Sequence, residues 1–201
     1  DDVREAKALY DEGFCHRAYK RWPEAIAAFQ KCVALDANHS DAWFWLGYAY
    51  YRQNGRKHCD ASFEPWTRCI ALDPKHAAAH HNLGTLLNDV RKDYDGAKKM
   101  YRKAIELDPK ITPPLWNLSL ILENQKNDLP GAIEAMEEYI RRGNPDNDGE
   151  QRLARLQREA DAKKVEAAKA SRSFLEACEA GNLREAKAFL ARGADVNWQE
   201  S

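Results

Sequence analysis

Small residues recur through most of this 201-residue chain at nearly constant spacing, with steps of 34, 37 and 35 residues. The members of this first series are Gly13, Gly47, Gly84 and Ser119. A second series, with steps of 37, 35 and 36 residues, consists of Ala37, Pro74, Pro109 and Pro145. Repeats of this length cannot each bury a core of their own, so they must stack on one another. This period constrains the fold more than any other feature of the sequence.

Each repeat also contains a small residue, then an aromatic residue or Met four positions later, then another small residue three positions further on. The four triplets are Ala25, Phe29 and Cys32; Ser62, Trp66 and Cys69; Ala97, Tyr101 and Ala104; and Ala132, Met136 and Tyr139, whose last member breaks the rule. This spacing places the three residues on one face of a helix. Turn-forming segments at 20–23, 54–57, 92–95 and 126–130 divide each repeat in two. The sequence therefore predicts four helix pairs stacked into a solenoid.

This pattern resembles the tetratricopeptide repeat family over about residues 5–145. The second repeat carries most of the family signature, in Trp43, Leu46, Gly47, Tyr50, Trp66, Ile70, Leu72 and Pro74. The resemblance implies an all-α, right-handed helix-turn-helix solenoid with repeats at about 5–38, 39–75, 76–110 and 111–145. The second repeat departs from the family by three extra residues around 56–60 and by Pro65 inside its second helix. We expect Ser62 to cap a shortened helix that keeps Pro65 in its first turn.

The character of the chain changes after Pro145, where a turn-forming run at 144–149 precedes a charged, Ala-rich segment of high helix propensity. We expect residues 146–170 to form a capping and connecting helix. Residues 171–197 resemble the opening of an ankyrin repeat, through Gly181-Asn182 and the turn at 193–197. This resemblance implies that residues 171–201 begin an ankyrin array and that more units follow. The first residue is Asp rather than Met, which also suggests a fragment.

Composition and motifs argue against several classes of function. The formal net charge of −1 gives no reason to expect a nucleic-acid partner, and the apolar run at 41–51 is too short to cross a membrane. Five cysteines without paired spacing or a secretory signal favour the cytoplasm. Without a phosphate-binding loop, a nucleophile elbow or an HExxH motif, we expect no enzyme and no cofactor. The His58-Cys59 and His80-His81 pairs lack the spacing of a metal site.

In tetratricopeptide proteins the first helix of each pair lines a concave groove that holds a peptide. Applied to this sequence, the rule predicts a groove with an aromatic N-terminal half and a polar C-terminal half. The candidate partner-binding residues are Tyr10, Phe14, Phe44, Trp45, Tyr48, Tyr51, His81, Asn82, Trp116 and Asn117. The carboxylate clamp of chaperone-binding family members is absent, because its places hold Tyr10, Phe14, Trp45, Ala78 and Asn82. The asparagine ladder of another subgroup is half present, in Asn82 and Asn117.

The main hypothesis is a non-enzymatic scaffold whose aromatic groove binds apolar or aromatic anchors of a protein or peptide partner. In the alternative interpretation, Phe44, Tyr48 and Tyr51 pack against neighbouring repeats, or a partner chain or the C-terminal helix covers them. Two further functions stay open. The chain could be the regulatory or substrate-docking arm of a larger enzyme, or it could form a homodimer through the aromatic face.

Overall fold

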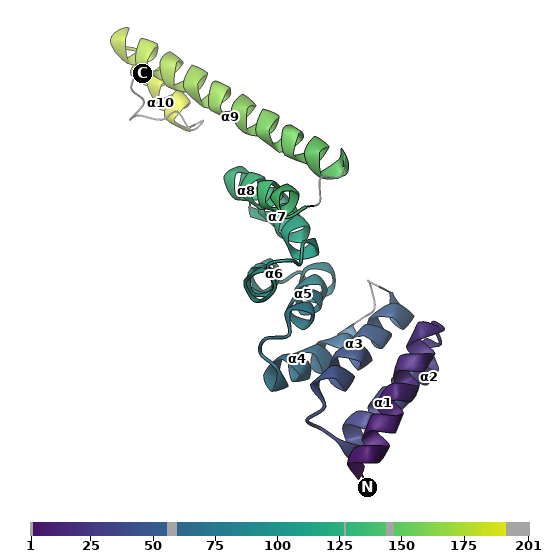
Figure 1. Cartoon of the computed structure of the whole chain (residues 1–201). Helices are drawn as coiled ribbons and strands as arrows, with labels where there is room; N and C mark the ends of the chain where they lie inside the picture. Colours follow the sequence, from purple (N-terminus) through teal and green to yellow (C-terminus); the bar gives the residue numbers. More distant parts are fainter. Residues whose placement is uncertain (1, 56–59, 127, 144–146, 192–201) are drawn as a thin grey trace.

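In the computed structural model the chain forms a row of helix pairs, each packed on the next (Figure 1). The structure describes residues 2–55, 60–126, 128–143 and 147–191. Four pairs are formed by α1 (Asp2–Ala18) with α2 (Trp22–Leu35), α3 (Ser40–Asn54) with α4 (Phe63–Leu72), α5 (Ala77–Leu86) with α6 (Tyr94–Leu107), and α7 (Pro113–Lys126) with α8 (Leu129–Arg141). Every regular element in the described ranges is helical. The prediction of an all-α solenoid is therefore confirmed.

The periodic small and aromatic residues form the contacts between the paired helices. Ala25, Phe29 and Cys32 on α2 are fully buried, as are Ala97, Tyr101 and Ala104 on α6. Large rings at this position pack directly on the glycines of the preceding helix, as Tyr101 does on Gly84. A burial of this kind is worth about 1.5–3 kcal/mol for each large apolar side chain. The repeat spacing of the sequence is thus the spacing of the interhelical contacts.

Short polar caps start and stop these helices at matching places in successive repeats. The Nδ1 atom of His39 accepts a hydrogen bond from the amide of Ala42 (3.3 Å), and that of His76 accepts one from Ala79 (3.1 Å). The carboxylates of Asp93 and Asp128 cap α6 and α8. These contacts satisfy amide groups that have no partner inside the helix. The first helices of the second and third pairs therefore begin where the sequence places a histidine.

The second repeat follows the predicted pattern in one respect and departs from it in another. Pro65 is the third residue of α4, in its first turn, as expected. The Ser62 side chain, however, forms no capping hydrogen bond, and its buried Oγ has no partner. A 3-10 turn, η1 (Asp60–Ser62), precedes α4 and already holds Ser62 in a helical conformation, whereas a capping serine needs an extended backbone. The predicted serine cap was wrong.

The third repeat contains a local change of helix type. After Leu86 the chain continues as a π-helical turn, η2 (Leu87–Arg91), which ends at Lys92 with a positive φ of 56°. The expected turn at 92–95 is therefore present, and α6 begins directly after Asp93. Because a π turn widens the helix, it displaces the side chains that follow it.

A long helix follows the four pairs. Helix α9 (Asn147–Glu179) packs against α8 through Leu153, Leu156 and Ala160, and its remaining length extends past the end of the solenoid (Figure 1). The helix is continuous through residue 170, where the sequence suggests a boundary between a connecting helix and a new unit. High helix propensity on both sides of that point explains the continuity. Helix α10 (Leu183–Ala191) turns back at Gly181, φ 70°, and packs on α9.

Candidate functional site

The first helices of the four pairs carry the candidate residues, which the structure places in three different environments. A row of aromatic side chains lies on α1 and α3, a pocket lies between α3, α5 and α7, and the last position contacts α9.

The aromatic row consists of Tyr10, Phe14, Trp45 and Tyr48. Successive ring centroids lie 6.1, 5.6 and 5.5 Å apart, and the Phe14–Trp45 and Trp45–Tyr48 pairs meet edge to face. Phe14 is 39% exposed, while Trp45 and Tyr48 are half-buried. Edge-to-face pairs contribute about 0.5–1.5 kcal/mol each beyond their buried area. The row is therefore a preformed apolar surface that is open to solvent along part of its length.

Two arginines contact this row. The guanidinium carbon of Arg17 lies 4.0 Å from the Phe14 ring centroid and 4.1 Å from that of Trp45. Arg52 donates a 2.8 Å hydrogen bond from Nη1 to the Tyr48 hydroxyl and lies 5.2 Å from the Trp22 ring. These are cation–π distances, at which the ring quadrupole attracts the cation.

Phe44 lies in the core rather than in the row. It is 7% exposed, and its ring packs against that of His76 in a tilted arrangement with centroids 4.5 Å apart. Tyr10 makes the equivalent contact one repeat earlier, on His39, at 4.7 Å. The capping histidine of each following helix thus covers the aromatic residue of the preceding one. For Phe44 this matches the interpretation in which the aromatic residue packs against the next repeat.

The pocket has a volume of about 300 Å³ and is built by three repeats together. Its lining residues are Tyr48, Tyr51, Trp66, His81, Asn82, Thr85, Pro113 and Asn117. Neither Asn82 nor Asn117 forms a side-chain hydrogen bond among the described residues. Both amides are therefore able to donate to and accept from a bound molecule.

His81 lines the pocket with an imidazole that is uncharged at physiological pH. Burial lowers the pKa of its imidazole from 6.5 to about 4, and its Nδ1 atom is buried without a hydrogen-bond partner. Its ring lies 5.8 Å from that of Tyr101. A neutral imidazole can donate one hydrogen bond and accept another, so His81 adds a further polar group to the two amides.

Trp116 is half-buried and contacts both α8 and α9. Its ring lies 5.5 Å from the Tyr139 ring and 5.5 Å from the Arg152 guanidinium of α9. Arg152 also pairs with Glu123, and Arg155 binds the other oxygen of that carboxylate at 2.7 Å. Helix α9 therefore contacts the fourth repeat, and no contact of α9 with Phe44, Tyr48 or Tyr51 is seen among the described residues.

The ten candidate residues thus divide into three groups. Five of them line the pocket, namely Tyr48, Tyr51, His81, Asn82 and Asn117. The aromatic row contains Tyr10, Phe14 and Trp45, together with Tyr48. The last two candidates pack against other parts of the chain, Phe44 on His76 and Trp116 on Arg152. The candidate set omitted Trp66, Arg17 and Arg52. The two arginines lie at helical spacing from Phe14 and Tyr48, a signal that could have found them.

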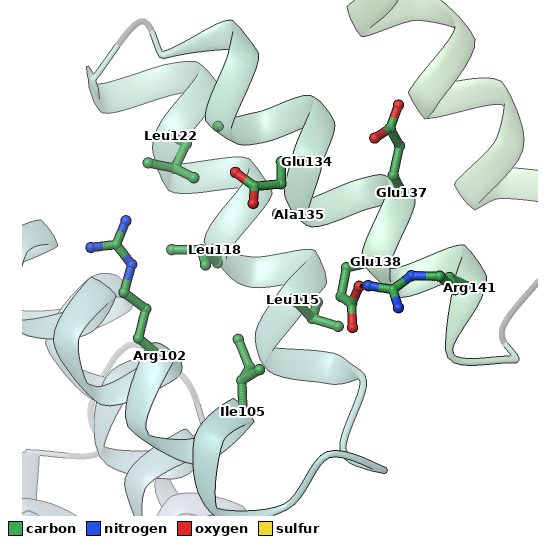
Figure 2. A pocket seen from close by; sticks show the side chains of 11 residues that line it. Arg102, Ile105, Leu115, Leu118, Leu122, Glu134, Ala135, Glu137, Glu138 and Arg141 are labelled. Atoms are coloured by element: carbon green, nitrogen blue, oxygen red, sulfur yellow. Dashed lines mark ion pairs between the residues drawn. The ribbon is translucent and has the colours of Figure 1, made fainter.

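A second type of cavity lies between the second helices of adjacent pairs. One, of about 470 Å³, has a floor of Leu115, Leu118 and Leu122 and carboxylates of α8 on its rim (Figure 2). Another, of about 480 Å³, lies at the equivalent place between α2 and α4 over α3. The two share matching positions of the repeat, so they are a consequence of the stacking geometry.

In the part of the chain that the structure describes, little supports a metal site, a membrane-spanning helix or a reactive thiol. There, no three His, Cys, Asp or Glu side chains gather as a metal site would require, and no helix combines the length and apolarity needed to cross a membrane. Burial raises the pKa of Cys32 to about 11 and that of Cys69 to about 12, which keeps both thiols protonated. Both behave as core residues, as predicted. The His58-Cys59 pair lies outside the described residues.

Comparison with known proteins identifies the type of repeat. Residues 16–54 match a family profile described as a TPR repeat, and residues 77–111 match one described as a tetratricopeptide repeat. The chain therefore contains tetratricopeptide repeats, and its fold is the solenoid that such repeats build. Both matches lie before residue 112, so the ankyrin resemblance of the C-terminal segment remains a prediction.

Solved structures of tetratricopeptide proteins share this fold. The structure titled "Crystal structure of MamA protein" is 19% identical, with 98% of each chain covered and a TM-score of 0.70. YrrB, titled a TPR protein with an unusual peptide-binding site, is 19% identical over 75% of this chain and 74% of its own, with a TM-score of 0.63. The first TPR of Spaghetti (RPAP3), bound to an HSP90 peptide, is 20% identical over 60% and 93%, with a TM-score of 0.56. No curated protein matched the chain.

Proposed function

We propose that this chain is a non-enzymatic, cytoplasmic protein-interaction module that binds an extended segment of a partner along its first helices. The observation that carries the proposal is the convergence of Tyr48, Tyr51, His81, Asn82 and Asn117 on one pocket, although they come from three repeats. Pockets of about this size with a few convergent polar groups are the usual form of a binding site.

The chemistry of the surface favours a peptide over a small polar metabolite. The aromatic row offers open apolar area to side-chain anchors, and exposed aromatic residues of this kind are frequent hot spots of protein interfaces. Asn82 and Asn117 can each pair with both the N–H and the C=O of a peptide backbone. An extended segment could therefore place apolar side chains on Phe14 and Trp45 while its backbone crosses the pocket.

Peptide recognition is also associated with two solved proteins of the same fold. The YrrB title refers to a peptide-binding site, and the Spaghetti domain was solved with an HSP90 peptide. The identities of 19% and 20% transfer the fold and not the ligand. Since the clamp cations are absent here, we do not expect a chaperone C-terminal carboxylate to be the partner.

The remaining parts of the chain extend this proposal. Residues 171–201 would begin an ankyrin array, another type of interaction repeat, so that the two repeat types are joined through α9. A regulatory or docking arm of a larger enzyme would use the same groove. Identifying the protein that such a groove captures would separate that case from a free-standing scaffold.

Selection from a displayed library of random peptides tests the proposal. We expect the chain to enrich peptides with apolar or aromatic anchors, and the Asn82→Ala/Asn117→Ala double variant to lose at least tenfold in affinity for them. Tyr48→Ala should act in the same direction. Glu134→Ala, on the rim of the outer cavity, is the matched control and should bind like the wild type.

Two results would contradict the proposal. One is the absence of any enriched peptide, and the other is enrichment that the groove variants do not affect. Light scattering of the unliganded chain measures its oligomeric state and so tests the self-association alternative. A homodimer that the Tyr48→Ala substitution dissociates would show that a second copy occupies the surface. Circular dichroism melts of each variant check that the fold is retained.

A further inference from the structure

Arg17 is held in a position that leaves its charge unneutralised. Its guanidinium carbon lies against both aromatic rings, 4.0 Å from the centroid of Phe14 and 4.1 Å from that of Trp45. Its Nε atom is buried and has no hydrogen-bond partner. Among the described residues, no carboxylate forms an ion pair with it. A desolvated donor without a partner is unfavourable, so the arrangement is expected to serve a ligand.

Two other arginines of this chain that lie over aromatic rings have a carboxylate partner, which Arg17 lacks. Arg91 lies 3.5 Å from the Phe63 ring and donates to Asp60 at 2.9 Å. Arg152 lies over Trp116 and pairs with Glu123. In both cases an aromatic ring and a carboxylate contact the same guanidinium. Arg17 has the rings but no carboxylate, which indicates that the anion comes from outside.

Arg52 and Tyr48 extend this environment. Arg52 donates to the Tyr48 hydroxyl at 2.8 Å, and no carboxylate pairs with Arg52 among the described residues. The hydroxyl accepts that bond and can still donate its own hydrogen. The Tyr48 ring in turn meets Trp45, 5.5 Å away, on which Arg17 is stacked. Each of the two cations therefore contacts one ring of the same aromatic pair.

From this geometry we propose that Arg17, Arg52 and the Tyr48 hydroxyl form an oxyanion site that binds an acidic side chain of the partner peptide. Among the described residues no carboxylate binds the Arg17 guanidinium, whose planar N–H groups suit bidentate binding of a carboxylate or phosphate. The inference rests on the proposed peptide-binding function and specifies its ligand. The partner segment carries an acidic residue next to the apolar anchor that contacts Phe14 and Trp45.

The acidic residues near the row do not occupy this place. Asp41 lies 3.9 Å from the His76 ring nitrogen, and its charge acts on Tyr10, at the other end of the row. Burial, and then the charge of Asp41, raises the pKa of Tyr10. Asp11 has a weaker effect on the same hydroxyl. The charge of Arg17 also acts on Tyr10 and lowers its pKa, so both acidic and basic groups influence that end of the row.

Both carboxylates and phosphates have the required chemistry, so the experiment includes both. Peptides enriched on the wild-type chain are synthesised in three forms, with the acidic residue as Asp or Glu, as the matching amide, and as phosphoserine. We expect the amide form to bind about tenfold more weakly, since it lacks the charge-assisted bonds. The stronger of the two anionic forms identifies the source of the oxyanion.

Substitutions of the two arginines test whether the preference for acidic peptides comes from the proposed oxyanion site. Arg17→Gln and Arg52→Gln should each reduce the difference between acidic and amide peptides, and the double variant should abolish it. Arg17→Lys keeps the charge but loses the planar edge, so we expect partial loss. Arg68→Gln, which removes an exposed arginine from α4, is the control and should keep the full preference. The Nε–H NMR signal of Arg17 should shift on binding.

The outcomes separate this inference from the function on which it rests. Enriched peptides without acidic residues, or equal binding of acidic and amide forms, would overturn the oxyanion site and leave the peptide groove intact. Absence of enrichment would overturn both. A preference for acidic peptides that survives in the Arg17→Gln/Arg52→Gln variant would place the anion elsewhere and also contradict the inference.

Discussion

Gly47 on α3 and Trp66 on α4 are in such close contact that a Cβ atom added to Gly47 would lie 2.6 Å from the indole Nε1. That nitrogen donates a 3.2 Å hydrogen bond to the carbonyl of Phe44, so the ring cannot easily move away. Phe29 lies against Gly13 in the same way. The paired helices can therefore approach this closely only because glycine has no side chain.

Replacing Gly47 with Ala should destabilise the solenoid by about 1–3 kcal/mol, the usual range for overpacking a core. In an exposed helix, replacing Gly with Ala would stabilise the fold by about 1 kcal/mol through helix propensity. Here we expect a lower free energy of unfolding instead, because the added Cβ would overpack the contact with Trp66. Urea unfolding measures the difference. The combined Gly47→Ala/Trp66→Leu variant should be less destabilised than the sum of its single changes, and a stabilised Gly47→Ala protein would contradict the contact.

The His39 cap should be measurable at the start of α3. Loss of the Nδ1 acceptor in His39→Ala removes the bond to the Ala42 amide, and caps of this kind contribute about 1 kcal/mol. Hydrogen exchange of that amide should accelerate. His39→Asn, which restores a side-chain acceptor but not the stacking on Tyr10, separates the two contributions, and unchanged exchange in His39→Ala would refute the cap.

The cysteines should differ in reactivity. Cys32 and Cys69 are fully buried, with pKa values raised by burial to about 11 and about 12, whereas Cys15 and Cys178 are exposed. Since the thiolate is the reactive form, we expect iodoacetamide at pH 8 to label the exposed pair first. Peptide mapping by mass spectrometry reads each site. Equal labelling rates in the native protein would contradict the burial of the core thiols, and labelling in urea provides the control.

His81 should make stability depend on pH. Its pKa is lowered from 6.5 to about 4 in the folded chain, so the unfolded chain binds the proton more readily between those values. Stability is therefore fully present above pH 6.5 and is lost as the pH falls toward 4, by about 2 kcal/mol at pH 5.

The measurement compares unfolding free energies at pH 7 and pH 5. His81→Phe should lose less stability on acidification than the wild type, because its ring takes up no proton. His16→Gln changes a histidine at the edge of α1, next to Glu12, and should keep the wild-type dependence. Identical pH dependence in the wild type and His81→Phe would contradict the prediction.

Glu123 should hold the start of α9 against the fourth repeat. It is 12% exposed and pairs with Arg152 and Arg155, so Glu123→Gln leaves two cations without their partner. We expect a loss of about 2 kcal/mol, as for hydrogen bonds to charged groups, with faster hydrogen exchange in α9. Glu159→Gln changes a more exposed pair and should have little effect. Unaltered exchange near residues 150–160 would show that α9 docks by its apolar contacts alone.

Sequence periodicity was sufficient to predict most of the fold. The spacing of small and aromatic residues follows directly from the geometry of paired helices, so it predicted the all-α solenoid. It failed at Ser62, where a preceding turn changed the backbone. It also missed the continuity of α9 past residue 170, since no residue there stops a helix.

The sequence by itself determined the solenoid, because each repeat carries the same packing residues and none can bury them alone. It also determined which helices would carry the candidate residues. Only the tertiary structure decided which of these residues are available. The packing of Phe44 on His76 and the docking of Arg152 on Trp116 join residues more than 30 positions apart in sequence. Such long-range contacts depend on how the repeats pack, and no local pattern encodes them. They leave the pocket and the row from Tyr10 to Tyr48 as the surface on which we propose that a partner binds.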